Sequence, residues 1–209
     1  MPLTCFAILA VMAATPSTGA TAAKDAQGRI HAYLTTHDVV DAKQLRALSP
    51  TPEKPLMAIA SDDHAEGLIR ARAVSALRLV PSPAIRDYLG KLVESKAKAV
   101  DASDRLIVRR AAVALGWLAA PHAPEKLAQL FANDDADVRL DAAIGLGLTR
   151  AADAADILRR QLLVEVVPRV HDQIERQLHI LAGPTTPEPE KGAKPEKATK
   201  PREPMRGGW

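Results

Sequence analysis

Cysteine and aromatic residues are scarce in this chain. Among 209 residues there is one cysteine, and tryptophan, tyrosine and phenylalanine occur twice each. A single cysteine excludes an intrachain disulfide framework and a zinc site built from several thiolates. Because aromatic side chains are so few, alanine, leucine and valine must fill the interior of the fold. This composition, with few alternating runs of β-branched residues, favours helices over strands.

Charge imbalance and catalytic signatures are also lacking. The formal net charge is +3 at pH 7, which is small for this length and does not demand a polyanionic partner. The sequence contains no glycine-rich phosphate loop, no Ser-His-Asp neighbourhood and no paired catalytic carboxylates. It therefore predicts a protein that is not an enzyme and needs no cofactor.

The first 22 residues have the pattern of a signal peptide. An apolar run, CFAILAVMAA, covers residues 5–14, and Ala20-Thr21-Ala22 fits a small-x-small cleavage site. No Lys or Arg precedes the run, which is too short to span a bilayer because spanning takes about 20 apolar residues. We expect cleavage after residue 22 and export to the periplasm or cell envelope, with no integral membrane span and no cysteine left in the mature chain. The alternative is an N-terminal helix that is packed or disordered.

Residues 183–209 differ in composition from the rest of the chain. They contain no Leu, Ile, Val or Phe and hold six of the 16 prolines, interspersed with Lys and Glu. Such a segment cannot bury enough apolar surface to fold. We expect a disordered, slightly basic tail that follows a folded domain at residues 23–182.

The folded domain repeats one pattern. Four similar stretches are IRARAVSALR from residue 69, IVRRAAVALG from 107, VRLDAAIGLG from 138 and VHDQIERQLH from 170. Each is preceded by another short apolar segment, so the period of 31 to 38 residues holds two helices. This arrangement predicts an all-α superhelix, or solenoid, of four to five antiparallel helix pairs. The small residues within the second helix of each pair, glycines included, then let that helix lie close to its neighbours.

These stretches resemble HEAT-like repeats, in particular the subtype first associated with bilin lyases. The pattern V-R-x-x-A-A-x-A-L-G is matched by residues 138–147 apart from Gly145. The second repeat has Val108 where Arg is usual, and the fourth replaces alanines as an end-capping repeat does. The resemblance covers residues 50–182, and together with the predicted signal peptide it suggests an exported bacterial member of the family. It specifies the fold but not the chemistry, because such repeats serve many roles, and we do not expect bilin-lyase activity.

Local details fit paired helices. We expect Asp137 to cap the helix that starts at Val138 and Pro168 to occupy a first helical turn. Residues 26–48, with Asp38 as a cap, are expected to form an opening helix pair. The resemblance also implies a structural ladder in which the turn acids pair with the arginines at the second pattern position. These acids and arginines are Asp62, Asp63, Asp134, Asp135, Arg70 and Arg139.

One stripe of the second helices is unusually apolar. Pattern positions one, five and nine centre the buried face of each helix, so positions three, seven and eleven lie opposite. In the two middle repeats this opposite stripe is largely apolar, and apolar surface of this kind marks partner sites, with tryptophan favoured at hot spots. The alternative is that the stripe is rotated from this position or covered by a neighbouring helix. The predicted protein-binding residues are Val113, Trp117, Leu140, Ile144 and Leu148, with Arg72 and Arg110 as a polar rim.

A polyanion is an alternative partner. Some HEAT-like DNA glycosylases grip DNA with a basic concave face, and arginines also occur on the second helices here. Asp141 and Asp172 interrupt the basic run, and export leads away from the genome, so we do not expect nucleic-acid binding. The arginines concerned are Arg70, Arg72, Arg109, Arg110 and Arg139.

A metal site is another alternative. His171, Glu175 and His179 lie one turn apart on the last predicted helix, and His with carboxylate ligands can hold zinc. The two histidines are separated by about 12 Å along the axis, too far to share one ion. One helix thus offers at most His171 with Glu175, or Glu175 with His179. We predict a solvated polar face and no metal.

Taken together, these patterns predict a non-catalytic scaffold or adaptor of the cell envelope. It binds an unidentified protein or peptide on the concave helix face of the second and third repeats. Polyanion binding and a metal-binding accessory role stay open as alternatives.

Overall fold

The computed structural model describes residues 18–37 and 39–183. Residues 1–17 of the predicted signal peptide and residues 184–209 of the predicted tail lie outside the described residues. Helices make up all the regular secondary structure of the described part, and none of them is long and apolar enough to cross a membrane. The elements are α1 (Thr18–Thr36), α2 (Ala42–Leu48), α3 (Glu53–Ala60), α4 (Gly67–Leu77), α5 (Pro83–Ser95), α6 (Ala102–Trp117), α7 (Ala123–Ala128), the short 3₁₀ helix η1 (Gln129–Ala132), α8 (Ala136–Thr149), α9 (Ala154–Leu162) and α10 (Pro168–Ala182).

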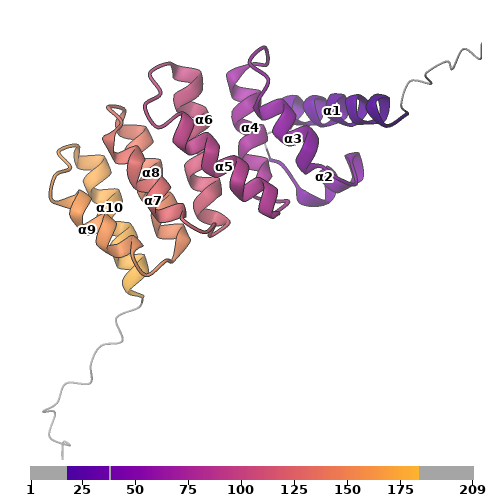
Figure 1. Cartoon of the computed structure of the whole chain (residues 1–209). Coiled ribbons are helices and arrows are strands. Elements are labelled where there is room, and N and C mark those ends of the chain that lie inside the picture. Colours follow the sequence, from indigo (N-terminus) through magenta and orange to yellow (C-terminus); the bar gives the residue numbers. More distant parts are fainter. Residues whose placement is uncertain (1–17, 38, 184–209) are drawn as a thin grey trace, which may run out of the picture.

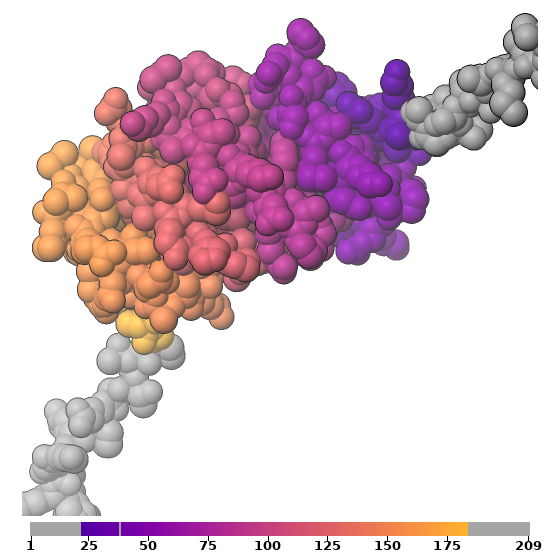
Figure 2. Space-filling model, viewed as in Figure 1, coloured from indigo at the N-terminus to yellow at the C-terminus, as the bar shows by residue number. Residues whose placement is uncertain are grey.

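The helices form a row of pairs (Figure 1). After α1 and α2, the pairs are α3 with α4, α5 with α6, α7 and η1 with α8, and α9 with α10. The space-filling surface is continuous from α1 to α10 (Figure 2). The prediction of an all-α solenoid with four to five helix pairs is confirmed.

The opening pair and the helix caps follow local sequence. Asp41 has extended backbone and accepts N–H bonds at the start of α2, whereas the expected cap Asp38 lies outside the described residues. Pro168 is the first residue of α10, as predicted. The predicted domain start at residue 23 falls inside α1, five residues after that helix begins.

The cap of α8 differs from the prediction. The Asp135 carboxylate accepts hydrogen bonds from the backbone N–H of Asp137 at 2.8 Å and of Val138 at 3.2 Å. Asp137 is therefore already in the first helical turn, and the expectation that it caps the helix is wrong. The physical reason is that Asp135 is the residue with extended backbone before the helix, which is what an N-cap requires.

The pairs build two layers that pack unequally. The second helices α4, α6, α8 and α10 pack on one another in succession, far more extensively than the first helices α3, α5, α7 and α9. A stacked array curves toward the layer whose members are closer together. We therefore name the exposed surface of the second helices the inner face and that of the first helices the outer face.

Small residues set the distance between the second helices. A Cβ atom added to Gly116 of α6 would lie 2.1 Å from the carbonyl oxygen of Gly145 on α8, and one added to Gly145 would lie 2.6 Å from the Ala112 carbonyl oxygen. Both contacts are with backbone, which cannot rotate away as a side chain can. Ala112, whose carbonyl oxygen Gly145 approaches, is itself buried and adds only a methyl group to this interface. The glycines at the middle of the array are thus required by close packing.

Arginines join neighbouring turns and repeats. The predicted pair of Arg70 with Asp63 is present, with nitrogen and oxygen 2.7 Å apart. Arg139 departs from the ladder implied by the resemblance, because it donates to the backbone carbonyls of Asn133 and Asp134 and directs its charge at Glu165 of the next repeat. The Glu165 side chain is only 1% exposed. The hydrogen bond from Arg139 lowers the pKa of Glu165 from its ordinary value of 4.5 to about 2.

We expect Gly116→Ala to destabilise the protein by about 1–3 kcal/mol, because the added methyl group meets backbone and forces α6 and α8 apart. Gly28→Ala on α1 is the matched control, because nothing lies within 4 Å of its added Cβ. This control should be stabilising by up to about 1 kcal/mol through helix propensity. Urea unfolding of both variants checks the difference, and equal stabilisation of the two would contradict the backbone contact.

We expect the Glu165 pair to make the fold acid-sensitive. A carboxylate with a lowered pKa in the folded state stabilises the fold above its unfolded pKa, and this contribution disappears as pH falls from about 4.5 to about 2. Glu165→Gln should cost about 2 kcal/mol at neutral pH. The difference in unfolding free energy between wild type and variant should shrink over that acid range. A difference independent of pH would show that the pair contributes no charge interaction.

Candidate functional site

The inner face carries an apolar surface across α6 and α8. Trp117, the last residue of α6, is 57% exposed, and Val113 one turn earlier is half-buried. On α8, Ile144 and Leu148 occupy the equivalent repeat positions and are also half-buried. Because α6 and α8 pack side by side, these four side chains belong to one surface. We name Val113, Trp117, Ile144 and Leu148 the apolar patch.

The third pattern position faces a neighbouring helix more than solvent. Leu140 is half-buried and packs against the core, and the equivalent Ala71 of the first repeat is 2% exposed. The Arg109 guanidinium reaches α8, where its Nε donates to Asp141 at 2.7 Å. Of the five predicted apolar site residues, Leu140 therefore contributes mainly to packing, and the structure brings the other four together.

A cleft adjoins the apolar patch at its N-terminal side. It has a volume of about 460 Å³ and lies against α4, with one wall from the segment before α2 and another from α6. We name it the arginine groove. Its lining residues are Val39, Val40, Leu68, Ala71, Arg72, Ser75, Ala76, Arg78, Leu79 and Arg110.

The two predicted rim residues, Arg72 and Arg110, both line this groove. Arg72 is half-buried, and its Nη1 donates to the Leu34 carbonyl oxygen at 2.8 Å, which ties α4 to the end of α1. Arg110 is exposed. Burial raises the pKa of the nearby Asp141 carboxyl, although the hydrogen bond from Arg109 and the charge of Arg110 act in the opposite direction. Asp141 is thus already bound by Arg109 rather than by Arg110.

Arg78 connects the groove to the patch, and the sequence prediction did not include it. Its guanidinium carbon lies 5.6 Å from the centre of the Trp117 ring, within the range of a cation–π contact. Leu68, at 52% exposed, and Val39, at 81%, add large apolar side chains to the same groove. Leu68 lies one helical turn before Ala71, so extending the predicted stripe backward along α4 finds it. Arg78 is the tenth residue of the first repeat stretch and does not occupy position three, seven or eleven, which explains its omission from the predicted stripe.

Three of the five arginines considered for polyanion binding are engaged by acids of the chain itself. Arg70 pairs with Asp63 and Arg139 with Glu165, and Arg109 pairs with the α8 carboxylates. The charges of these three arginines therefore take part in ion pairs within the fold.

The last helix gathers a small set of metal-ligand groups. One ligand atom from each of His171, Asp172 and Glu175 lies within 4.8 Å of the other two, and the His171 Nδ1 to Glu175 Oε1 distance is 3.9 Å. The structure thus brings together one of the predicted i, i+4 pairs and adds Asp172. The two acids are exposed and His171 is half-buried. Clusters of exposed acids of this kind are common without an ion.

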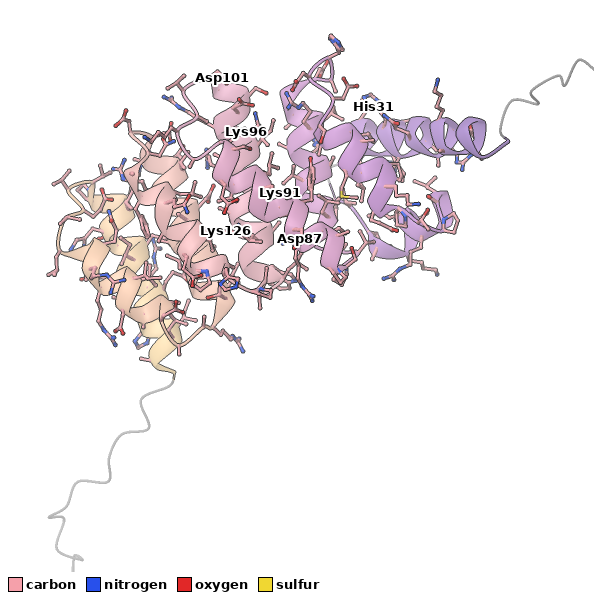
Figure 3. All side chains as sticks on the ribbon, viewed as in Figure 1. His31, Asp87, Lys91, Lys96, Asp101 and Lys126 are labelled. Atoms are coloured by element: carbon pink, nitrogen blue, oxygen red, sulfur yellow. The ribbon has the colours of Figure 1, made fainter. Side chains whose placement is uncertain are left out.

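The outer face has a different character. Figure 3 shows Asp87 and Lys91 on α5 and Lys126 on α7, so these two helices carry charges of both signs. Lys126 forms an ion pair with Glu94, and Lys96 with Asp104. Interspersed charges of this kind belong to a solvated surface. The apolar patch and the arginine groove therefore single out the inner face.

Residues 53–147 match the family of HEAT repeats. No curated protein and no solved structure gives a significant match. The matched residues extend from the start of α3 into α8 and include the arginine groove from Leu68 onward and most of the apolar patch. The repeating helix pairs agree with this match, which identifies residues 53–147 as similar to HEAT repeats.

Proposed function

We propose that the protein is a non-catalytic scaffold or adaptor that binds a protein or peptide on its inner face. HEAT repeats generally serve as protein-interaction scaffolds. The observation that carries the proposal is the exposed Trp117, which stands beside three half-buried aliphatic side chains of two packed helices. An exposed tryptophan beside aliphatic side chains, with arginines nearby, is typical of a protein-binding hot spot.

The same observations favour a protein over a polyanion. A nucleic acid is held mainly through many contacts between cations and phosphates. Arg70, Arg109 and Arg139 are bound by acids of the chain, so few of the inner-face arginines are left for phosphates. The apolar patch can pack against apolar side chains of a protein partner, whereas a phosphate backbone has none.

We propose further that the protein works in the cell envelope. The support is the apolar run at residues 5–14 followed by the small residues Ala20-Thr21-Ala22. Cleavage there would shorten α1 by its first five residues and leave the rest of the helix in place.

We expect a partner to be cross-linked from position 117. A photoreactive aromatic amino acid replaces Trp117 and keeps its size, and the matched control carries the same group in place of Lys91 on the outer face (Figure 3). Cross-linking in cells should give one adduct from position 117 that is absent from position 91. An adduct from position 91 alone would place the binding surface on the outer face.

We expect Trp117→Arg to abolish that interaction while changing stability by less than about 1 kcal/mol, because the side chain is already 57% exposed. Leu163→Arg is the control, because Leu163 is 86% exposed but lies at the end of α9. Circular dichroism melts and affinity capture test both variants. If Trp117→Arg unfolds the helices, Trp117 is a core residue and the proposed site is wrong.

We expect the mature protein to begin at residue 23. Mass spectrometry of the intact protein from an envelope fraction measures this, and Ala20→Arg with Ala22→Arg should block cleavage because small residues are required there. Recovery of chains that keep residues 1–22 from the cytoplasm would contradict export.

A further inference from the structure

We infer that the partner segment is an acidic peptide with large apolar side chains, which places carboxylates on Arg78 and Arg110 and apolar groups on Leu68, Leu79 and Trp117. This inference rests on the proposed function and specifies the chemistry of its partner. It is argued from the arginine groove and from the contact between Arg78 and Trp117.

The charge of the groove is of one sign. Its lining includes three arginines, and among the lining residues that the structure describes there is no acidic side chain. Arg78 and Arg110 are both exposed and reach the groove from adjacent helices, α4 and α6. The nearby Asp141 already accepts a hydrogen bond from Arg109 at 2.7 Å. Two guanidinium groups directed at one cleft attract carboxylates, which they can bind through paired N–H donors.

The groove is apolar between its arginines. Leu68, Leu79 and the two valines before α2 supply aliphatic surface, and the Trp117 ring lies beneath Arg78. When an arginine lies over an aromatic ring, the ring shields its aliphatic stem and one face of its guanidinium from water. The N–H groups of Arg78 that point away from the ring can donate to a hydrogen-bond acceptor of the partner. An occupant that carries only charge would leave the apolar lining exposed to water, so the surface fits alternating acidic and apolar side chains.

The chain's own C-terminal segment does not have this composition. Residues 183–209 contain six basic and four acidic residues and no Leu, Ile, Val or Phe. Its net positive charge is repelled by the arginines, and it has few large apolar side chains to offer. This segment is therefore not the occupant, and the inference commits to a peptide segment of another protein.

The experiment uses the full chain with Trp209→Phe, which leaves Trp117 as the sole tryptophan. The probe is a short synthetic peptide in which Asp and Glu alternate with Leu and Phe. Binding should change Trp117 fluorescence and protect it from acrylamide quenching, because the indole goes from 57% exposed to covered. Affinity should fall as salt is raised, because the contacts are partly between charges.

Arg78→Gln with Arg110→Gln should weaken binding of this peptide at least about tenfold, because two charge-assisted contacts are lost. The matched control is Arg159→Gln with Arg160→Gln on α9, which removes the same charge from exposed residues at the other end of the array. This control should bind as the parent chain does. Thermal melts of both double variants establish that each is folded.

Three probes with altered chemistry decide the outcome. A peptide with Asn and Gln in place of the acids, poly-glutamate and a single-stranded oligonucleotide should each bind at least about tenfold more weakly. Equal binding of the amide peptide would overturn the role of the arginines, and equal binding of poly-glutamate or the oligonucleotide would make the groove a general polyanion site. If no peptide binds but position 117 still cross-links a partner in cells, the inference fails and the proposed function stands. If both experiments are negative, both fail.

Discussion

The fold depends on how closely α6 approaches α8. At Gly116 and Gly145 the two helices meet through their backbones, where a single Cβ atom would fall 2.1 Å from a carbonyl oxygen. This contact fixes the separation of the second helices at the middle of the array. It therefore also fixes the positions of Val113 and Ile144, which lie within one turn of these glycines on the inner face. The apolar patch thus takes its shape from residues that it does not contain.

Sequence patterns were sufficient for the architecture. Alanine and glycine at repeated positions, with a period of 31 to 38 residues, predicted helix pairs whose second members pack closely. They were less informative about helix ends, because several aspartates precede α8 and only the backbone angles select Asp135 over Asp137 as its cap. The ladder implied by the family resemblance also misplaced the carboxylate partner of Arg139, because Glu165 comes from the next repeat and its distance in sequence gives no hint of contact.

The candidate site was predictable in part, because helical periodicity indicates on which face of a helix a residue lies. Helical periodicity identified Val113, Trp117, Ile144 and Leu148, which depend only on the face of their own helix. It assigned Leu140 to the same stripe, although that side chain turns toward the core. The arginine groove required tertiary structure, because its walls come from α4, α6 and the segment before α2. No local pattern places Arg78 over the Trp117 ring.

The unequal packing of the two helix layers has a mechanical consequence. When a beam bends, the material near its neutral axis keeps its length while the distant fibres stretch or shorten. Here the second helices are the more tightly packed layer, so bending of the array would change the spacing of the first helices more than that of the second. The spacing between Trp117 and Ile144, which α6 and α8 carry, would then vary least. The shape of the apolar patch is thereby separated from changes in the curvature of the array.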